Sequence, residues 1–306
     1  MRSLSDEKLK IIAAECGIIL AIVLGIIKAL TAFYTGSLSI LSSMIDSLSD
    51  AFSSLVSLIA VRFSALPLND KHRYGYGKAE SLSAFLQAAF IIGSGIFVLY
   101  DGIRRFINPE VVKETTIGVA VMIFSVIATF AVISFQKYVA RKTKSLALEA
   151  ESQHYVVDIL TNAAIIFSLL FLKYFDWQWI DIATAFIISI YLIWNAVILA
   201  LKALADITDR EADDETKELI KQAIAETKNA LGYHDLRSRV SGMRTFVELH
   251  LELDGNSSLY ETHKISDEVE QRIIEKLPNV QVIIHQDPHG LKEIRLDDEL
   301  KGKCDL

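Results

Sequence analysis

Long apolar runs dominate the first two thirds of this chain, and they limit how it can fold. The chain has 306 residues, of which 52% are hydrophobic, and its mean hydropathy is +0.35. The apolar residues gather before residue 203 in runs of about 20 residues, the length that crosses ~30 Å of hydrocarbon as a helix. After residue 206 the sequence becomes charged and amphipathic. We therefore predict a helical membrane domain at 1–206 and a soluble α/β domain at 207–306.

Six segments have the length and composition of membrane-spanning helices. They cover residues 10–33, 38–61, 80–101, 115–136, 146–172 and 178–202. Lys and Arg are concentrated before the first segment and in the second and fourth connections, whereas the connections on the opposite side have fewer. By the positive-inside rule, both termini and the soluble domain are expected on the cytoplasmic side. The sequence thus predicts an all-α bundle of six transmembrane helices.

The soluble domain has the pattern of a small α/β fold. Amphipathic helices are predicted at "DDETKELIKQAIAET" and "SLYETHKISDEVEQRIIEKLP", and strands at "HDLRSRVSG", "RTFVELHLELD" and "VQVIIHQD". In the second strand, apolar residues alternate with Glu248, His250 and Glu252, which predicts one buried face and one wet face. The order αββαβ predicts an open-faced α/β sandwich.

Charge and cysteine content exclude several kinds of function. The formal net charge is −7, which argues against nucleic acid as a partner. The two cysteines, Cys16 and Cys304, form no CxxC or other metal-binding spacing. A structural disulfide is not expected between a membrane span and a tail, so the cysteines give no functional signal.

Charged and imidazole side chains interrupt two of the apolar spans. Asp46 and Asp50 lie in the second span, and His154 and Asp158 lie in the fifth. Each pair has i, i+4 spacing, which places both members on one helix face. A charged Asp near the bilayer centre costs about 2.5–3.5 kcal/mol, so it requires a partner. With a rise of ~1.5 Å per residue on antiparallel spans, both pairs fall about 12–18 Å from the outer edge. We expect the four groups to meet.

Three carboxylates and one imidazole form a mixed N/O ligand set. Such a set suits tetrahedral Zn²⁺ and tolerates other divalent first-row ions. Two other interpretations stay open at this point. The polar groups can join helices within the membrane, or they can form a proton relay without metal. We expect the metal site.

The motifs together resemble the cation diffusion facilitator family, within it the bacterial zinc and ferrous-iron efflux branch. The two intramembrane pairs match that family, as do "HRYGYGKAESLSAF" after the second span and "ITDREADDE" before the soluble domain. The resemblance covers nearly the whole chain. It implies a homodimeric transporter of the bacterial cytoplasmic membrane, not an enzyme, with a ferredoxin-like, copper-chaperone-like cytoplasmic domain. The family's transport site carries over onto Asp46, Asp50, His154 and Asp158.

Further sites follow from the same resemblance. The family's cytoplasmic metal cluster matches His234, His250, His263, His285 and Asp287, with His289 as a bystander. Its charge interlock between protomers matches Lys78 and Asp209. A loop metal site of some relatives is expected to be missing, because Asn69 and Tyr76 replace its Asp and His and neither is a good zinc ligand.

These observations predict divalent metal efflux by proton antiport, with Zn²⁺ as the transported ion and Cd²⁺ or Fe²⁺ as further candidates. No prosthetic group is expected; the partners are a second copy of the chain, membrane lipid and protons. His154 is the expected proton carrier because imidazole titrates nearest neutrality, and Asp50 is expected to share that role. The alternative is a membrane metal sensor that binds but does not transport. A passive channel is disfavoured, because conduction requires weak sites.

Overall fold

The structure of the chain divides into two compact units. It is a computed structural model that describes residues 2–35, 38–107, 116–156, 159–160, 179–277, 279–292 and 294–301. The units are Met1–Ile207, called here the membrane unit, and Thr208–Leu306, called the soluble unit.

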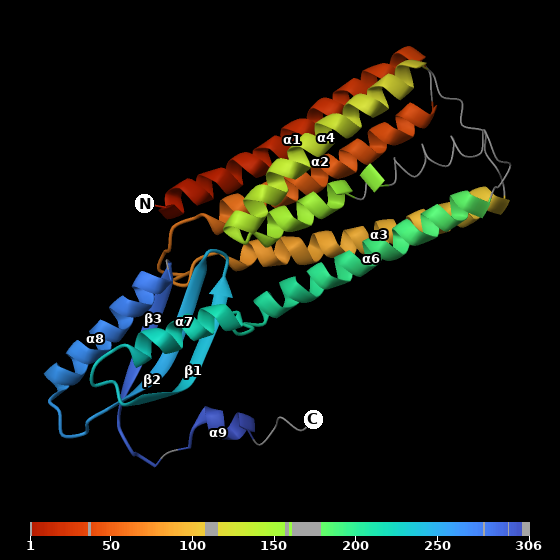
Figure 1. Ribbon diagram of the computed structural model, residues 1–306. Helices are drawn as coiled ribbons and strands as arrows, with labels where there is room; N and C mark the ends of the chain where they lie inside the picture. The colour runs from red at the N-terminus through yellow and green to blue at the C-terminus, as the bar shows by residue number, and fades with distance from the viewer. Residues whose placement is uncertain are drawn as a thin grey trace. The chain divides into compact units, whose positions relative to one another are not determined.

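The described part of the membrane unit is helical. Its long helices are α1 (Arg2–Thr35), α2 (Leu38–Ser64), α3 (Lys78–Ile107), α4 (Thr116–Thr143) and α6 (Trp179–Ile207). A further helical segment covers residues 146–156. Figure 1 shows α3 and α6 running side by side, and α1 packs against α2 and α4. Most of the remainder of the predicted fifth span, residues 161–172, lies outside the described residues.

Length and composition identify membrane-crossing segments within these helices. Among the described residues, four helices contain stretches that are long and apolar enough to cross a membrane: Asp6–Thr31, Lys78–Phe97, Ile123–Thr143 and Ser189–Ile207. Each overlaps one of the six predicted spans. The expectation of six spans in total stays a prediction.

Small side chains fill the interior of the membrane unit, and large apolar side chains cover its outside. One buried cluster contains Ala13, Ala14, Ala60, Ala140 and Ala147, packed with Leu58, Val61, Val139 and Leu148. In contrast, Ile19, Phe97 and Trp194 have 60%, 65% and 67% of their surface exposed. Small residues let helices approach closely in a membrane, where lipid rather than water solvates the outer surface. The distribution is that of a membrane protein.

A buried ion pair joins the ends of several helices of the membrane unit. Lys10 of α1 donates to Glu80 of α3, and each side chain is only 3% exposed. Glu80 also accepts from Ser64 at the end of α2, at 2.6 Å, and from Ser145 in the turn before the 146–156 helix. Because an isolated buried charge is costly, these contacts stabilise the carboxylate and fix the helix ends relative to one another.

The soluble unit has the predicted order αββαβ, followed by a short helix that the sequence did not indicate. Its elements are α7 (Asp214–Ala225), β1 (Gly232–Ser241), β2 (Arg244–Leu253), α8 (Leu259–Lys276), β3 (Val280–Pro288) and α9 (Leu296–Lys301). The sheet order is β1-β2-β3, with β1 antiparallel and β3 parallel to β2 (Figure 1). The parallel pair requires a crossover, which α8 provides.

Both long helices of the soluble unit pack on one face of the sheet. Ile220 and Ile224 of α7 and Val269 and Ile273 of α8 share a buried core with Val247, Leu249, Leu251 and Leu253 of β2. The alternating apolar face of β2 therefore faces the helices, as its period of two predicts. Ser258 and Glu261 form a capping box that fixes the start of α8.

One expectation for the opposite face of β2 is wrong. Glu252 was expected to be wet, but it is only 7% exposed. It is covered because His289 and Arg295, which follow β3, and His234 of β1 all bond to its carboxylate. The chain beyond β3 thus covers one end of the open face.

Candidate functional site

The first candidate site lies between two helices of the membrane unit. Nε2 of His154, on the 146–156 helix, lies 3.1 Å from Oδ1 of Asp50 on α2. Their side chains are 7% and 14% exposed. Tyr155 directly follows His154, and Ser54 lies one turn after Asp50. Their hydroxyls share a hydrogen bond of 2.7 Å between the same two helices. The helices are therefore held together where the candidate ligands meet.

The structure describes the side-chain contacts of two of the four predicted intramembrane ligands. It brings together Asp50 and His154, one member of each sequence pair. Asp46 lies on α2 one turn before Asp50, while Asp158 falls outside the described residues. A carboxylate and an imidazole at this separation offer one oxygen and one nitrogen to a divalent ion. They can equally share a proton, because metal and proton compete for the same lone pairs.

A buried carboxylate that sequence reasoning missed lies one turn before His154. Glu151 is 0% exposed, and neither carboxylate oxygen makes a hydrogen bond of good geometry within the described residues; the same is true of Oε1 of Gln136. A Cβ added to Gly17 would lie 2.1 Å from Oε1 of Glu151 and 2.7 Å from Nε2 of Gln136. Gly17 is therefore the residue that lets α1 approach this group. The only signal in the sequence was the i, i+3 spacing to His154.

The second candidate site is a row of histidines across the sheet of the soluble unit. His234 of β1 pairs in register with His250 of β2, and His250 pairs with His285 of β3. Residues in one row point to the same face of a sheet. The ring centroids are accordingly 5.0 Å apart for His234 and His250, and 4.6 Å apart for His250 and His285.

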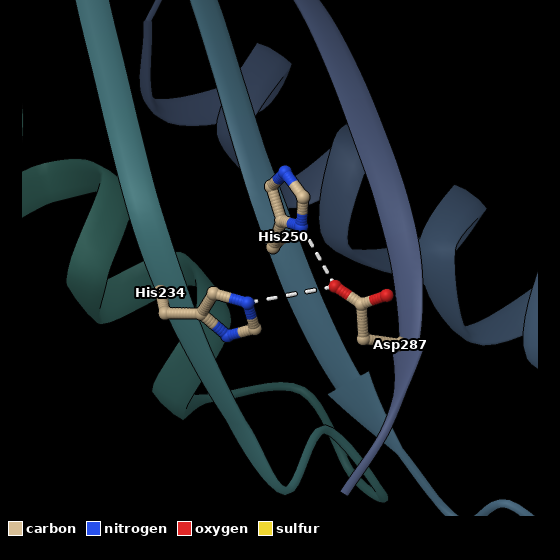
Figure 2. Close-up of side chains that lie close together, drawn as sticks. All are labelled: His234, His250 and Asp287. Carbon is tan, nitrogen blue, oxygen red and sulfur yellow. Dashed lines mark hydrogen bonds and ion pairs between the residues drawn. The ribbon is translucent and has the colours of Figure 1, made fainter. Parts of the chain in front are cut away.

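Asp287 joins this row on the same face, two residues after His285. Oδ2 of Asp287 lies 2.7 Å from Nδ1 of His250 and 3.5 Å from Nε2 of His234 (Figure 2). One ligand atom from each of His234, His250 and Asp287 lies within 4.8 Å of the others. Two imidazole nitrogens and a carboxylate oxygen that converge in this way fit a transition metal such as zinc. His285 reaches the other oxygen of Asp287, with 3.3 Å between Nε2 and Oδ1.

Glu252 orients the His234 ring through Nδ1, the ring nitrogen that does not face Asp287. Its Oε1 lies 3.1 Å from Nδ1 of His234, and Oε2 lies 2.7 Å from Nδ1 of His289. Burial raises the pKa of Glu252, but its bonds to His289 and His234 and the charge of Arg295 outweigh burial, so its pKa lies below the ordinary value. The carboxylate is therefore ionised at neutral pH. When Nδ1–H of His234 donates a hydrogen bond to this carboxylate, the lone pair of Nε2 faces Asp287, as metal-binding histidines require.

Some predicted residues lie apart from these clusters. His263 of α8 is paired with Asp267, at 3.6 Å, and its side chain is 64% exposed. Lys78 donates to the carbonyl of Ile207 at 3.1 Å, while Asp209 pairs with Arg239 at 3.3 Å. The structure does not bring His263 to the histidine row.

In the loop after α2, Asn69 and Tyr76 contact each other; these are the residues that replace the expected Asp and His ligands. Nδ2 of Asn69 donates to the hydroxyl of Tyr76 at 2.6 Å. The ring of His72 packs against that of Tyr76, with centroids 4.4 Å apart. A neutral amide and a phenol replace the expected ligands, and they bond to each other. The loss of a loop metal site stays a prediction.

Comparisons with known proteins cover both units. Residues 16–208 match the family described as "Cation efflux transmembrane domain", and residues 212–289 match "Cation efflux protein, cytoplasmic domain". The chain is 39% identical over 277 residues to the cation-efflux pump FieF of Shewanella oneidensis, an alignment that covers 90% of this chain and 93% of that protein. FieF of Klebsiella pneumoniae is 39% identical over 279 residues, covering 91% and 93%. A solved structure, the metal-bound C-terminal domain of the CzcD transporter from Thermotoga maritima, is 24% identical and covers 26% of this chain and 93% of that chain, with a TM-score of 0.25.

Proposed function

This chain belongs to the cation efflux family of membrane transporters, and we propose that it exports Zn²⁺ from the cytoplasm in exchange for protons. Cd²⁺ and Fe²⁺ are proposed as further substrates, because the same N/O ligands accept other divalent ions. The observation that carries the proposal is the buried contact between Asp50 and His154 at 3.1 Å. As a family member the protein is a transporter and not an enzyme.

The proposed transport site consists of four groups. Asp50 and His154 are completed by Asp46, one turn earlier on α2, and by Asp158, four residues after His154 in the sequence. Three carboxylates and one imidazole satisfy a tetrahedral zinc ion. Without a cation, three carboxylates inside a membrane would repel one another at high cost, so a bound cation or protons must accompany them.

The exchange of metal for protons follows from the chemistry of these ligands. An imidazole nitrogen and a carboxylate must lose their protons to bind a metal, so metal binding releases protons and protonation releases metal. His154 is the proposed proton carrier, because imidazole is the side chain whose ordinary pKa lies nearest neutral pH, and Asp50 shares its hydrogen bond. In the proposed orientation, with both termini in the cytoplasm of a bacterial inner membrane, metal enters from the cytoplasm and leaves outward.

The soluble unit supplies the proposed regulatory metal site. His234, His250 and Asp287 would hold the ion, with His285 at the exposed edge, and the ion supplies a positive centre that neutralises Asp287. We propose that the chain acts as a homodimer, because residues 212–289 match the cytoplasmic domain of the family. We also propose that Lys78 and Asp209 form a charge interlock between the two protomers. His263 is proposed to bind a metal ion that the two protomers share.

Metal uptake into proteoliposomes tests the transport function. The full-length protein is reconstituted with an imposed pH gradient and offered Zn²⁺, Cd²⁺, Fe²⁺ or Mn²⁺ separately. We expect gradient-dependent Zn²⁺ uptake that Asp50→Asn abolishes, whereas Asp70→Asn, in the exposed loop after α2, retains it. Zinc binding without uptake in the native protein would instead identify a membrane sensor.

A further inference from the structure

A groove in the membrane unit has a basic lining that the metal site does not explain. Its volume is about 550 Å³, and its lining residues come from α3, α4, the 146–156 helix, the turn before that helix, and α6. The charged lining residues are Lys137, Arg141, Lys144, Lys202 and Glu149. Glu149 pairs with Lys202, at 2.9 Å between Oε1 and Nζ. The positive charges of Lys137 and Arg141 repel a cation and favour an anionic occupant.

The basic residues of α4 stand in line at its C-terminal end. Lys137 and Arg141 are four residues apart, which places them on one side of the helix, and Lys144, just beyond the helix end, lines the same groove. Cations here also complement the helix dipole and obey the positive-inside rule, so their charge alone indicates no ligand. The additional observation is a second hollow of about 450 Å³, which shares Lys137 and Arg141 with the groove. Lys137 and Arg141 therefore line both cavities.

The rest of the lining is apolar or hydrogen-bonding. Its large apolar members are Ile91, Leu146, Val156 and Leu192. Among its polar members, Gln153 has a buried Oε1 that accepts no hydrogen bond from the described residues, and Asn195 and Tyr191 lie on α6. The lining thus combines cations, hydrogen-bonding groups and a hydrocarbon surface. A phospholipid has the complementary parts in the same molecule: a phosphate, a glycerol backbone and acyl chains.

The position of the groove along the helices matches the level of lipid headgroups. Lys137 and Arg141 lie in the last turns of the candidate span Ile123–Thr143, and Lys202 lies near the end of Ser189–Ile207. Basic pockets between transmembrane helices at the cytoplasmic side are known to hold anionic headgroups.

We propose that this groove binds an anionic phospholipid. Lys137 and Arg141 contact its phosphodiester, and one acyl chain follows the apolar lining. A soluble phosphate would satisfy the two cations but would leave the apolar lining exposed to water, so a lipid accounts for more of the groove. The proposal requires only that the chain lies in a membrane, and it holds for any transported ion.

Lipid retention by the purified full-length protein tests this proposal. The protein is equilibrated in mixed micelles with equal amounts of phosphatidylglycerol and phosphatidylcholine, and bound lipid is measured by native mass spectrometry. The test variant is Lys137→Gln with Arg141→Gln. The matched control is Lys71→Gln with Arg73→Gln, which removes two exposed cations from the loop after α2. A parallel sample contains inorganic phosphate in excess as competitor.

We expect preferential retention of phosphatidylglycerol that falls on the order of tenfold in the Lys137/Arg141 variant and stays unchanged in the control and in phosphate. Equal loss in the control would mean general surface attraction, and displacement by phosphate would mean a site for soluble anions. Either result overturns the proposal, as does equal retention of both lipids. If the test variant fails to fold, Leu146→Trp narrows the groove without changing its charge and should reduce retention in the same way.

Discussion

Nε2 of His154 lies 3.1 Å from Oδ1 of Asp50, although the two residues are 104 positions apart in the chain. Both side chains are largely buried, in a unit whose outer surface is apolar. A carboxylate and an imidazole in this setting bind either a metal ion or protons, and one displaces the other. The proposed exchange of metal for protons rests on this contact.

Replacing His154 with Asp removes the nitrogen from the proposed ligand set. We expect the preference for Zn²⁺ over Mn²⁺ to fall by on the order of tenfold, because imidazole suits zinc whereas carboxylate oxygens suit manganese. Uptake of each ion in competition, in proteoliposomes, measures this ratio. An unchanged ratio would place His154 outside the coordination sphere of the transported ion.

Asp287→Asn should weaken metal binding by the soluble unit. The carboxylate reaches both His250 and His234, at 2.7 and 3.5 Å, and an amide is a much poorer zinc ligand. We expect added Zn²⁺ to raise the melting temperature less in this variant than in the native protein, because binding to the folded state raises it and only the proposed transport site remains. Differential scanning calorimetry of the full-length protein measures it. Glu275→Gln, at an exposed acid on α8, serves as the control and should keep the full rise.

Gly17→Ala should destabilise the membrane unit. The added Cβ would overlap the ends of the Glu151 and Gln136 side chains, so these two flexible groups must shift, at a cost of about 1 kcal/mol. Thermal unfolding in detergent should show a lower melting temperature. The matched control is Gly93→Ala on α3, where an added Cβ meets nothing within 4 Å. Equal melting temperatures for the two variants would show that α1 does not pack against Glu151 in this way.

Replacing Lys10 and Glu80 together should lower the stability of the membrane unit by less than the sum of the two single replacements. Either Lys10→Met or Glu80→Gln leaves a partner buried at 3% exposure, and such a change costs about 3–5 kcal/mol. The double variant removes both charges, so it should be less destabilised than the sum of the single variants. A double-mutant cycle on thermal unfolding gives the coupling between them. Strictly additive effects would mean that the pair is not formed in the protein.

The sequence predicted those features that depend on short-range spacing. The period of two in β2 placed Leu249 and Leu251 on the core side, and the order αββαβ is confirmed. The resemblance to a family of metal transporters is confirmed by the matches over both units. The contact between Asp50 and His154 followed from counting helical rise on two antiparallel spans, a rule that needs no knowledge of side-chain packing.

Features that depend on distant contacts could not be predicted in this way. Glu252 alternates with apolar residues and so appeared wet, but His289 and Arg295, more than thirty residues later, cover it. Glu151 lies near the start of the predicted fifth span, 146–172, and no sequence pattern singled it out. Its carboxylate is buried where Gly17, on a different helix, leaves space for it. Neither the contacts that cover Glu252 nor the packing around Glu151 produces a local pattern in the sequence.

Simultaneous recording of metal and protons tests the central claim, that metal export is an exchange for protons, most directly. Proteoliposomes with a trapped pH indicator and a trapped zinc indicator receive external Zn²⁺ without any imposed gradient. The account predicts that the lumen becomes more alkaline as Zn²⁺ enters, because each ion displaces protons outward, and that Asp50→Asn abolishes both signals. Zinc entry by the native protein without a change in luminal pH would contradict it.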